Sequence, residues 1–352
     1  MKSQKIENKL GEVKFRKKIS SQQSKNKKFF KNERKFGETV LELRRRVKRT
    51  SQDFKRLKRA GINFTTYLEI GAEYCPRASL LENKFACQGI ATDLSLDSLS
   101  SAKNFQKFLG FKKIPQRVVC DAYNLPFPNS SVPFVFCYQT LHHFPNPKPI
   151  LTEIYRILSP GGYFFFSEEP VKQWLNLPLW RRPTVLRPWE KALKYIGVLP
   201  FISRIGKTEV DHGILEEVFP LTTWEKALNV FDSVQTITKP YPFGPQSQNS
   251  KSKSNWLHPK LSTKFLMLAW GGGIEAICKK EGSLLKNPPG NILNSLNCPN
   301  CLSRKKISAK LQLEKTGAFC PKCKRDYPKK AGILILLRDR EMRKLYGEKA
   351  NA

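Results

Sequence analysis

Strand-sized apolar runs alternate with helical patterns between residues 66 and 170. Helical patterns at 78–85, 99–109 and 149–158 separate these runs, which lie at Tyr67–Ile70, Gln88–Thr92, Arg117–Cys120, Phe134–Tyr138 and Tyr163–Ser167. Strands that alternate with helices of this length favour right-handed crossovers between parallel strands. The pattern predicts an α/β fold with a doubly wound, mostly parallel sheet as the core of the chain, over residues 61–170.

The segment before this core predicts two different states. Residues 1–36 are rich in Lys, Asn, Gln and Ser and poor in apolar residues, which indicates a basic disordered tail. Over residues 37–60, apolar residues recur at helical spacing among many Arg and Lys: Val40, Leu43, Val47, Phe54 and Leu57. This segment predicts a basic amphipathic helix that ends at Gly61.

The segment after the core, residues 171–290, is expected to form a cap and the last strands of the sheet. It contains all six tryptophans and several Pro breaks. Thr263–Ala269 and Ile274–Cys278 have the composition of strands, and 241–255 has that of a loop. Residues 284–297 are expected to link this region to a small cysteine-bearing unit at 291–340, which a tail at 341–352 follows.

Charge is distributed unevenly along the chain, whose formal net charge is +34. Residues 1–60 carry 22 basic and 6 acidic residues, 61–170 carry nine of each, and 298–352 carry 15 and 5. Attraction to RNA or to an anionic membrane surface is therefore expected at the ends, where the helix at 38–60 has a suitable amphipathic form. A Lys- and Asn-rich proteome would also give such tails without any partner.

Neither a membrane span nor a secretory signal is expected. The longest apolar runs are strand-sized, and the first residues, Met1-Lys-Ser-Gln-Lys, lack an apolar segment. The sequence therefore predicts a cytoplasmic protein.

Glycine and acidic residues follow the first three predicted strands. Gly71 follows the first, Asp93 ends the second 22 residues later, and Asp121-Ala122 follows the third. Parallel sheets bind ligands at these carboxyl ends, where a glycine lets a ligand approach the backbone and a carboxylate accepts from a ribose diol. The spacing predicts a nucleoside site.

These pieces resemble class I S-adenosylmethionine-dependent methyltransferases of the small-molecule and ubiquinone-biosynthesis-like type. The resemblance covers 67–170, through YLEIG, ATDLS, RVVCDAYNLPFPNSS, FVFCYQTLHHF and LTEIYRILSPGGYFFFSEEP. It implies a Rossmann-like sheet and S-adenosylmethionine as cofactor. It also implies a role for six residues: Glu69 and Gly71 flanking the methionine moiety, Asp93 at the ribose, Asp121 and Ala122 at the adenine, and Gln139 near the transferring methyl.

The sequence departs from this family at the glycine-rich turn. The turn is Gly71-Ala72-Glu73-Tyr74-Cys75, with a single glycine where the family has three. Glu73 and Tyr74 would crowd the site, so a structural relic without cofactor is the alternative. The Asp common before the fourth strand is also replaced around Val132-Pro133.

Candidate catalytic residues are His143, Glu168 and His212. His143, with His142, follows the fourth strand, and Glu168, with Glu169, ends the fifth. His212 would be a base oriented by Glu216, one helical turn away. In each case a plainer role is open: a polar residue at a helix start, a solvated carboxylate, or a surface helix.

Two cysteine pairs near the C-terminus predict a zinc site. Cys298, Cys301, Cys320 and Cys323 form C-x2-C, eighteen residues, C-x2-C, which is the spacing of a four-thiolate tetrahedral site. With its surroundings at 293–340, the unit resembles the zinc-ribbon activator family of tRNA and protein methyltransferases. That resemblance implies a ribbon that stabilises a methyltransferase, here in the same chain; a nucleic-acid-binding finger is the alternative.

Three functions remain open from the sequence. The first is methyl transfer to a small or lipid-linked metabolite, with the aromatic segment 171–260 as acceptor pocket. The second is RNA methylation, with the basic tail and ribbon for binding. The third is a non-catalytic scaffold with a methyltransferase fold.

Overall fold

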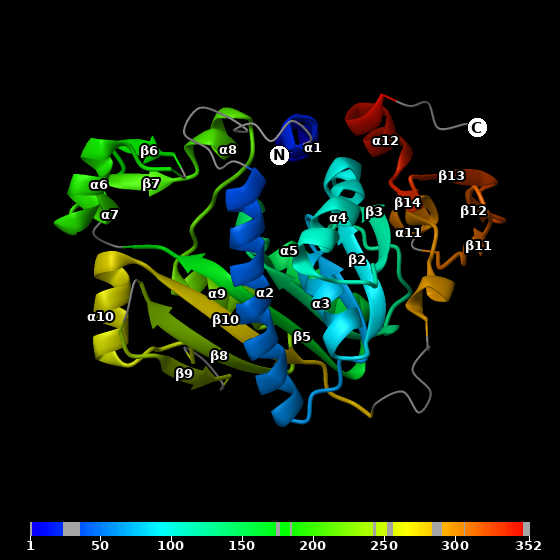
Figure 1. Ribbon diagram of the computed structural model, residues 1–352. Helices are drawn as coiled ribbons and strands as arrows, with labels where there is room; N and C mark the ends of the chain where they lie inside the picture. Colours follow the sequence, from blue (N-terminus) through cyan, green and yellow to red (C-terminus); the bar gives the residue numbers. More distant parts are fainter. Residues whose placement is uncertain are drawn as a thin grey trace.

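The computed structural model describes residues 2–23, 36–173, 177–183, 185–241, 244–251, 256–283, 291–305 and 307–347. A 12-stranded sheet runs through it in the order β11-β12-β13-β14-β3-β2-β1-β4-β5-β10-β8-β9 (Figure 1). Its strands are β1 Thr66–Ile70, β2 Gln88–Asp93, β3 Gln116–Cys120, β4 Val132–Tyr138, β5 Leu158–Val171, β8 Ser233–Pro240, β9 Ser247–Ser250, β10 Gly272–Lys279, β11 Gln312–Leu313, β12 Gly317–Cys320, β13 Arg325–Lys330 and β14 Ile333–Leu336. A separate parallel pair consists of β6 Trp180–Arg182 and β7 Ser203–Ile205.

The five strands predicted in the core are present as β1 to β5, and all pair in parallel. The α/β Rossmann-like fold is confirmed. The helices are α1 Lys2–Gln23, α2 Phe36–Arg59, α3 Pro76–Lys84, α4 Leu96–Leu109, α5 Lys148–Ile157, α6 Pro188–Tyr195, α7 Leu199–Ile202, α8 Lys207–Asp211, α9 Leu221–Leu228, α10 Leu261–Trp270, α11 Pro299–Lys305 and α12 Asp339–Tyr346, with 3₁₀ turns η1 Leu141–His143 and η2 Ile292–Ser295.

Two apolar layers cover the two faces of the sheet. In β5, Phe164 and Phe166 point into the layer that contains α5 and α9, while Phe165 points into the layer that contains α2, α3 and α4. Because successive strand residues point to opposite faces, a continuous apolar run such as β5 supplies both cores. This burial on both faces holds the strand ends in a fixed arrangement around the site.

The basic helix predicted at 37–60 forms as α2 and packs on the sheet. Phe54 and Leu57 are fully buried, and the Phe54 ring lies 5.2 Å from Phe136 and 6.3 Å from Phe165. Much of the apolar stripe of α2 is therefore covered by the protein, with Leu41 as an exposed exception.

The predicted disordered tail is wrong for residues 2–23, which form α1; residues 24–35 lie outside the described residues. Val13, Phe15 and Ile19 are buried, and Gly11 lies so close to Gly213 that a Cβ would be 2.6 Å from its carbonyl oxygen. The composition of this segment predicted disorder because it contains few apolar residues. Those few pack against residues far along the chain, and such contacts cannot be recognised from the local sequence.

The C-terminal unit continues the central sheet. β14 pairs in parallel with β3 through Leu334, Ile335 and Leu336, and Ile333 and Ile335 belong to the same apolar layer as α3 and α4. The predicted tail at 341–352 is wrong as far as 346, because α12 covers this segment and buries Met342 and Leu345; residues 348–352 lie outside the described ones.

Three predictions in the region 171–290 meet different outcomes. Ile274–Cys278 lies in β10, a strand of the sheet that pairs with β5 on one side and with β8 on the other. Thr263–Ala269 is a helix, α10, rather than a strand. The predicted loop 241–255 contains β9, paired with β8.

Within the described ranges, none of the helices combines the length and the apolar character needed to cross a membrane.

Candidate active site

A cavity of about 1270 Å³ opens at the carboxyl ends of β1 to β5. It is bounded by α1 and α2 on one side and reaches β7 and α10 on the other. β1 lies between β2 and β4, so the connections leave β1 and β4 in opposite directions and the crevice opens where they diverge. Gly71, Asp93, Asp121, Ala122, Gln139, His143 and Glu168, seven of the site residues predicted from the sequence, line this one cavity.

Gly71 ends β1 in a left-handed conformation, with φ +69°. A Cβ at this position would lie 2.4 Å from Thr140 Oγ1, so only glycine permits the close approach of the turns after β1 and β4. The single glycine that the sequence retains is the one that this contact requires.

Asp93 binds the turn after β1. Its Oδ2 accepts from the Glu73 backbone N–H at 2.9 Å and its Oδ1 from the Ser95 N–H at 2.9 Å. Burial raises the pKa of Asp93 to about 6. Each oxygen keeps a lone pair, so the carboxylate is placed to accept from hydroxyl groups of a ligand in the cavity.

Asp121 is held by a residue that sequence reasoning missed. Lys9 of α1 donates to Asp121 Oδ2 at 2.7 Å and to Glu341 of α12 at 2.9 Å, while the Tyr123 backbone N–H donates to Asp121 Oδ1. Burial raises the pKa of Asp121 and Lys9 opposes that rise. Elements from both ends of the chain thus meet at this corner of the cavity.

The two residues expected to crowd the turn are both held by other parts of the chain. Glu73 is bound by Arg16 at 2.6 Å and by Arg46 at 3.0 Å, and these arginines hold its pKa below the ordinary value although burial would raise it. The Tyr74 ring packs on Phe105 with centroids 4.4 Å apart. Both residues border the cavity with their side chains engaged at its wall.

Glu69 and Gln139 occupy different positions. Glu69 is buried behind the cavity lining, where its carboxylate accepts from the Ala78 N–H at the start of α3 at 3.1 Å; burial raises its pKa to about 8. Gln139 lines the cavity in a left-handed conformation, with φ 49°. Glu69 therefore positions α3 rather than bordering the cavity.

An acid–base cluster lies beyond Gln139. The Glu169 carboxylate accepts from the backbone N–H groups of Thr140, Leu141 and His142 at 2.7–3.1 Å. Burial would raise the pKa of Glu169, but the adjacent His142 and these hydrogen bonds keep it below the ordinary value. The ionised carboxylate only accepts, so His142 Nδ1, at 2.8 Å, carries a hydrogen.

The other ring nitrogen of His142, Nε2, lies on the side of Glu216. Glu216 Oε2 lies 3.7 Å from His142 Nε2, and Oε1 lies 3.7 Å from His143 Nδ1. Burial raises the pKa of Glu216 to about 7. The sequence pointed to the pairs His142-His143 and Glu168-Glu169, but it missed the contact of Glu216 with the histidines, which are more than seventy residues away.

The remaining predicted catalytic residues fare unequally. His143 lines the cavity, where its Nδ1 lies 2.8 Å from the Leu215 carbonyl oxygen. Glu168 also lines it, in an ion pair with Arg49 at 2.9 Å. His212 is outside the lining: it follows α8, contacts the Thr208 carbonyl and packs on Phe15 of α1. The helical spacing expected between His212 and Glu216 is wrong, because α8 ends at Asp211.

The far end of the cavity is lined by apolar and aromatic groups. They include Pro170, Val171, Tyr195, Tyr241, Leu266 and Trp270. Basic side chains of the segment 177–205 also line the cavity: Arg181, Arg182, Lys194 and Arg204. Two of the other tryptophans, Trp224 and Trp256, are buried in the core instead, and Trp174 lies outside the described residues. The acceptor pocket predicted from the tryptophan-rich segment thus rests on Trp270 together with residues of other types.

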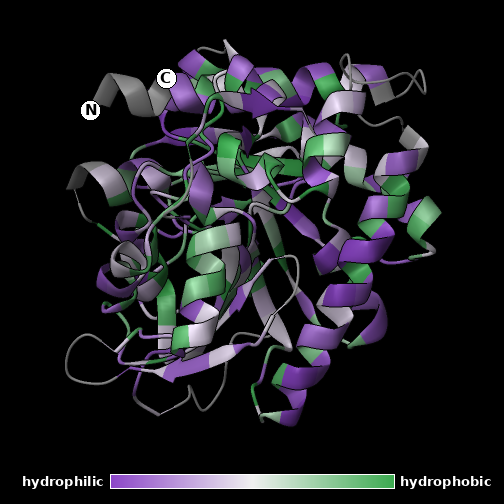
Figure 2. Cartoon of the chain, turned by 90° about the vertical axis from the view of Figure 1, so that its left-hand side faces the viewer, coloured by the Kyte–Doolittle hydropathy of each residue, from purple (hydrophilic) through white to green (hydrophobic). Residues whose placement is uncertain are grey.

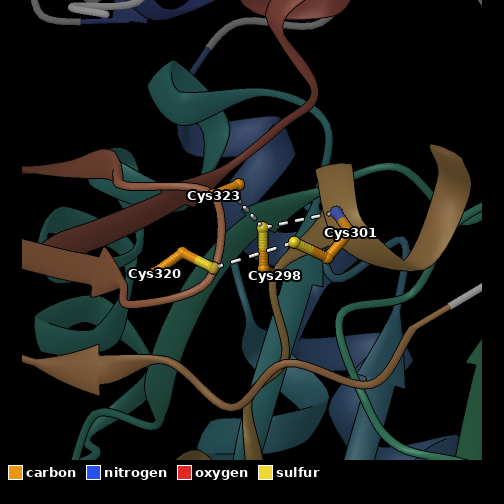
Figure 3. A group of neighbouring side chains, drawn as sticks. All are labelled: Cys298, Cys301, Cys320 and Cys323. Atoms are coloured by element: carbon orange, nitrogen blue, oxygen red, sulfur yellow. Dashed lines mark hydrogen bonds between the residues drawn. The ribbon is translucent and has the colours of Figure 1, made fainter. Parts of the chain in front are cut away.

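The four cysteines of the C-terminal unit converge (Figure 3). Cys298 and Cys323 have their sulfurs 3.5 Å apart, and Cys301 and Cys320 have theirs 3.8 Å apart. Sulfurs that bind one tetrahedral zinc at about 2.3 Å lie about 3.8 Å from each other. The Cys301 N–H also donates to Cys298 Sγ at 3.4 Å, as in a metal-binding knuckle. The set fits a zinc ion.

The segment that builds the cavity is similar in sequence to known methyltransferases. Residues 68–166 match the family described as "Methyltransferase domain". A fatty-acid O-methyltransferase of Mycolicibacterium smegmatis is 28% identical over 116 residues, 33% of this chain and 40% of that protein. A probable phthiotriol/phenolphthiotriol dimycocerosates methyltransferase 2 of Mycobacterium ulcerans is 32% identical over 94 residues, 27% of this chain and 32% of that protein.

The chain spans less than half the length of these curated relatives. Among solved structures, the YcgJ protein of Bacillus subtilis is 15% identical and has a TM-score of 0.35, with 62% of this chain and 92% of that chain covered. The sequence matches, centred on the strands whose carboxyl ends build the cavity, show that residues 68–166 are a methyltransferase domain.

Proposed function

We propose that this protein is an S-adenosylmethionine-dependent methyltransferase whose acceptor is a lipid-linked or otherwise strongly apolar molecule with an oxygen nucleophile. The observation that carries the proposal is the continuity of one cavity. It joins the Gly71, Asp93 and Asp121 strand ends, the acid–base cluster around His142 and the apolar end at Leu266 and Trp270.

The residues at the strand ends fit the cofactor. Asp93 has free lone pairs toward the cavity for the ribose, and the Gly71 turn offers backbone without a side chain in the way. Asp121 and Ala122 would face the adenine, with Lys9 beside them. When bound, S-adenosylmethionine supplies an electrophilic methyl group on a sulfonium, so positioning of the acceptor provides much of the rate.

His142 and Glu216 would remove the acceptor proton. Glu169 fixes the Nδ1–H tautomer of His142, so Nε2 is the basic atom and faces the cavity side where Glu216 lies. The raised pKa of Glu216 lets the carboxylate exchange a proton near neutral pH. His143 and Glu168 would bound the acceptor rather than act as the base, because each is already engaged, by Leu215 and by Arg49.

The apolar end of the cavity favours a lipid-linked acceptor over a polar one. The relatives named for fatty acids and for dimycocerosates support the same class. RNA remains the second candidate acceptor, since exposed arginines of α2 such as Arg45 give a basic surface. A third possibility, a non-catalytic scaffold with a methyltransferase fold, predicts no methyl transfer.

We further propose that the unit at 291–340 is a zinc ribbon. Cys298, Cys301, Cys320 and Cys323 would hold one zinc ion in a structural site, because all four positions are filled by protein thiolates. The metal would supply no chemistry to methyl transfer, and its effect would be to hold β14 and α12 beside the cofactor end.

The test incubates full-length protein with methyl-labelled S-adenosylmethionine and a cell extract that is then separated into lipid, aqueous and RNA fractions. Label in the lipid fraction is the expected result, and Asp93→Ala is expected to abolish it. Label confined to RNA would refute the acceptor class. Calorimetric binding of the cofactor with no transfer to any fraction would support the scaffold instead. Asp326→Asn, an exposed change in the ribbon, is the control.

A further inference from the structure

The region that follows the methyltransferase core exposes large apolar side chains in unusual density. Leu177, Leu179, Tyr195, Ile196, Leu261 and Phe265 are each more than 60% exposed, with Tyr195 at 93% and Leu261 at 83%. Exposed apolar residues are usually scattered singly over a protein surface. These six come from the segment 177–205 and from α10, so their gathering requires an explanation.

Contacts between the elements join these side chains into one surface, which we call the cap face: residues 177–205 with α10. The short helix α7 contacts both α6 and α10, and the rings of Phe201 and Trp270 lie 6.0 Å apart. The backbone N–H groups of Leu177 and Leu179 donate to the carbonyls of Phe201 and Ile202. Figure 1 shows α6, α7 and α10 together on the side of the molecule away from β11 to β13.

The cap face is basic as well as apolar. Residues 177–205 and 260–271 contain eight Arg and Lys and one acidic residue, Glu190. Glu190 is fully buried and bound by Arg187 and Trp180. Lysines 191, 194, 260 and 264 are exposed beside the exposed apolar groups. Figure 2, which turns this side toward the viewer, shows green apolar segments interleaved with purple polar ones.

The cap face also borders the open end of the cavity. Tyr195, one of these six residues, also lines the cavity, as do Trp270, which is 39% exposed, and Leu266 of α10. The cap face therefore borders the same cavity that contains the acid–base cluster. A molecule drawn from a bilayer at this face would enter the cavity beside these apolar side chains.

We propose that the cap face docks on the surface of an anionic lipid bilayer, from which the acceptor enters the cavity. Leucine and aromatic tips flanked by lysines fit the boundary between headgroups and acyl chains, where apolar groups insert and lysines contact anionic headgroups. Excess positive charge with no exposed acidic partner on this face complements that surface. The inference deepens the proposed function and rests on its lipid-linked acceptor.

This surface differs from the one that the sequence indicated. Attraction of the helix at 37–60 to anionic headgroups was one possibility that the sequence left open, but α2 buries Phe54 and Leu57 on the sheet. The cap face has no comparable helical periodicity in the sequence, because it is assembled from the short helices α6, α7 and α10 and the strand pair β6–β7. Among the described residues, six of its large apolar side chains are more than 60% exposed, whereas α2 exposes Leu41.

The test is sedimentation of the full-length protein with vesicles of phosphatidylcholine alone or of phosphatidylcholine with phosphatidylglycerol. We expect binding to the anionic vesicles. Changing Lys191, Lys194, Lys260 and Lys264 to Gln is expected to weaken it at least about tenfold, since lysines near an anionic surface each add to the attraction. Leu261→Ser with Phe265→Ser is expected to remove the part of the binding that survives high salt.

Leu41→Ser with Leu313→Ser is the matched control, because both leucines are exposed but lie on α2 and β11; it should bind like the wild type. Equal binding by the cap-face variants and this control would overturn the proposal. A cap face that is buried in a dimer would also overturn it; light scattering would then show that the Leu261→Ser, Phe265→Ser variant loses the dimer mass of the wild type. Binding of RNA by the cap face, without binding of vesicles, would overturn it too. Vesicle binding without methyl transfer would keep the docking and refute the proposed function, whereas transfer to a dissolved acceptor without vesicle binding would do the reverse.

Discussion

At the scale of one carboxyl group, the proposed role of Asp93 predicts that cofactor binding depends on pH. Its pKa is raised from 3.8 to about 6 by burial. A protonated Asp93 loses acceptor capacity toward ribose hydroxyls, so we expect affinity for S-adenosylmethionine to fall as pH decreases from 7 to 5. Calorimetric titrations across this range check it, and a flat profile for Asp93→Asn, with weaker binding throughout, would attribute the effect to this residue.

The same raised pKa affects stability with the opposite sign. Between pH 4 and 6 the folded Asp93 binds a proton that the unfolded chain releases, so its contribution to the unfolding free energy grows as pH falls. Denaturant unfolding of wild type and Asp93→Asn at pH 4.5 and 7 measures this. We expect the unfolding free energy of wild type, relative to that of Asp93→Asn, to rise from pH 7 to pH 4.5. A fall of this relative stability on acidification would contradict the assignment.

Gly71 and Gly110 separate two costs of replacing a glycine. Both have positive φ, +69° and +72°, but an added Cβ meets Thr140 Oγ1 at 2.4 Å in the first case and nothing within 4 Å in the second. Gly110→Ala is expected to lower the unfolding free energy by about 1 kcal/mol. Gly71→Ala should cost about 1–3 kcal/mol more, since an overpacked site must shift its neighbours, and should weaken cofactor binding as well. Equal losses in urea denaturation would show that the contact with Thr140 is unimportant.

Glu216 tests the assignment of the base. Its pKa of about 7 predicts a limb near pH 7 in the pH profile of methyl transfer. Glu216→Gln is expected to remove this limb and lower kcat about a hundredfold, with KM for the cofactor little changed. Asp211→Asn, which changes an exposed carboxylate paired with Lys207, should leave the profile intact. A Glu216→Gln profile that keeps the limb would show that Glu216 does not exchange the proton with His142.

At the scale of elements, α1 is attached to the cofactor end by few, specific ion pairs. Lys9 contacts Asp121 and Glu341, and Arg16 contacts Glu73. Lys9→Gln with Arg16→Gln is therefore expected to increase hydrogen exchange of residues 7–22 and to speed cofactor dissociation. Lys14→Gln with Lys17→Gln changes exposed lysines of the same helix and should leave both unchanged. If the two pairs of substitutions had equal effects, α1 would be held by its apolar residues alone.

The elements also show which signals a sequence carries. β1 to β5 and the helices between them were predictable because strands that are buried on both faces consist of continuous apolar runs. Glycine or acidic residues that follow the first three runs also marked where those strands end. The helix α10 was mistaken for a strand, since Phe265-Leu266-Met267-Leu268 is a short apolar run, for which periodicity does not distinguish the two states. α1 was missed because Lys9 meets partners 112 and 332 residues away, and Glu216 because it meets His142 across a long connection.

At the scale of the whole molecule, the two ends of the chain close the site that its middle builds. Lys9 of α1 and Glu341 of α12 meet at Asp121, and α12 follows β14, which lies in the central sheet beside β3. The C-terminal unit is therefore part of the same structure as the methyltransferase core. A change at the four cysteines should reach the cofactor end through β14 and α12.

Loss of the proposed zinc site should accordingly destabilise the whole protein rather than one domain. Cys298→Ser with Cys301→Ser is expected to abolish bound zinc, because two of four ligands are lost. With the ribbon unfolded, β14 would leave the edge of β3 and expose the layer around Ile333 and Ile335. We expect a single unfolding transition at lower Tm and weaker cofactor binding, measured by metal analysis, calorimetry and titration. Cys87→Ser removes a buried thiol outside the cluster and should retain zinc. Two separate unfolding transitions, with the Tm and the cofactor affinity of the core unchanged, would show that ribbon and core are independent. We expect one transition because the two parts share a sheet, and unfolding of one part should destabilise the other.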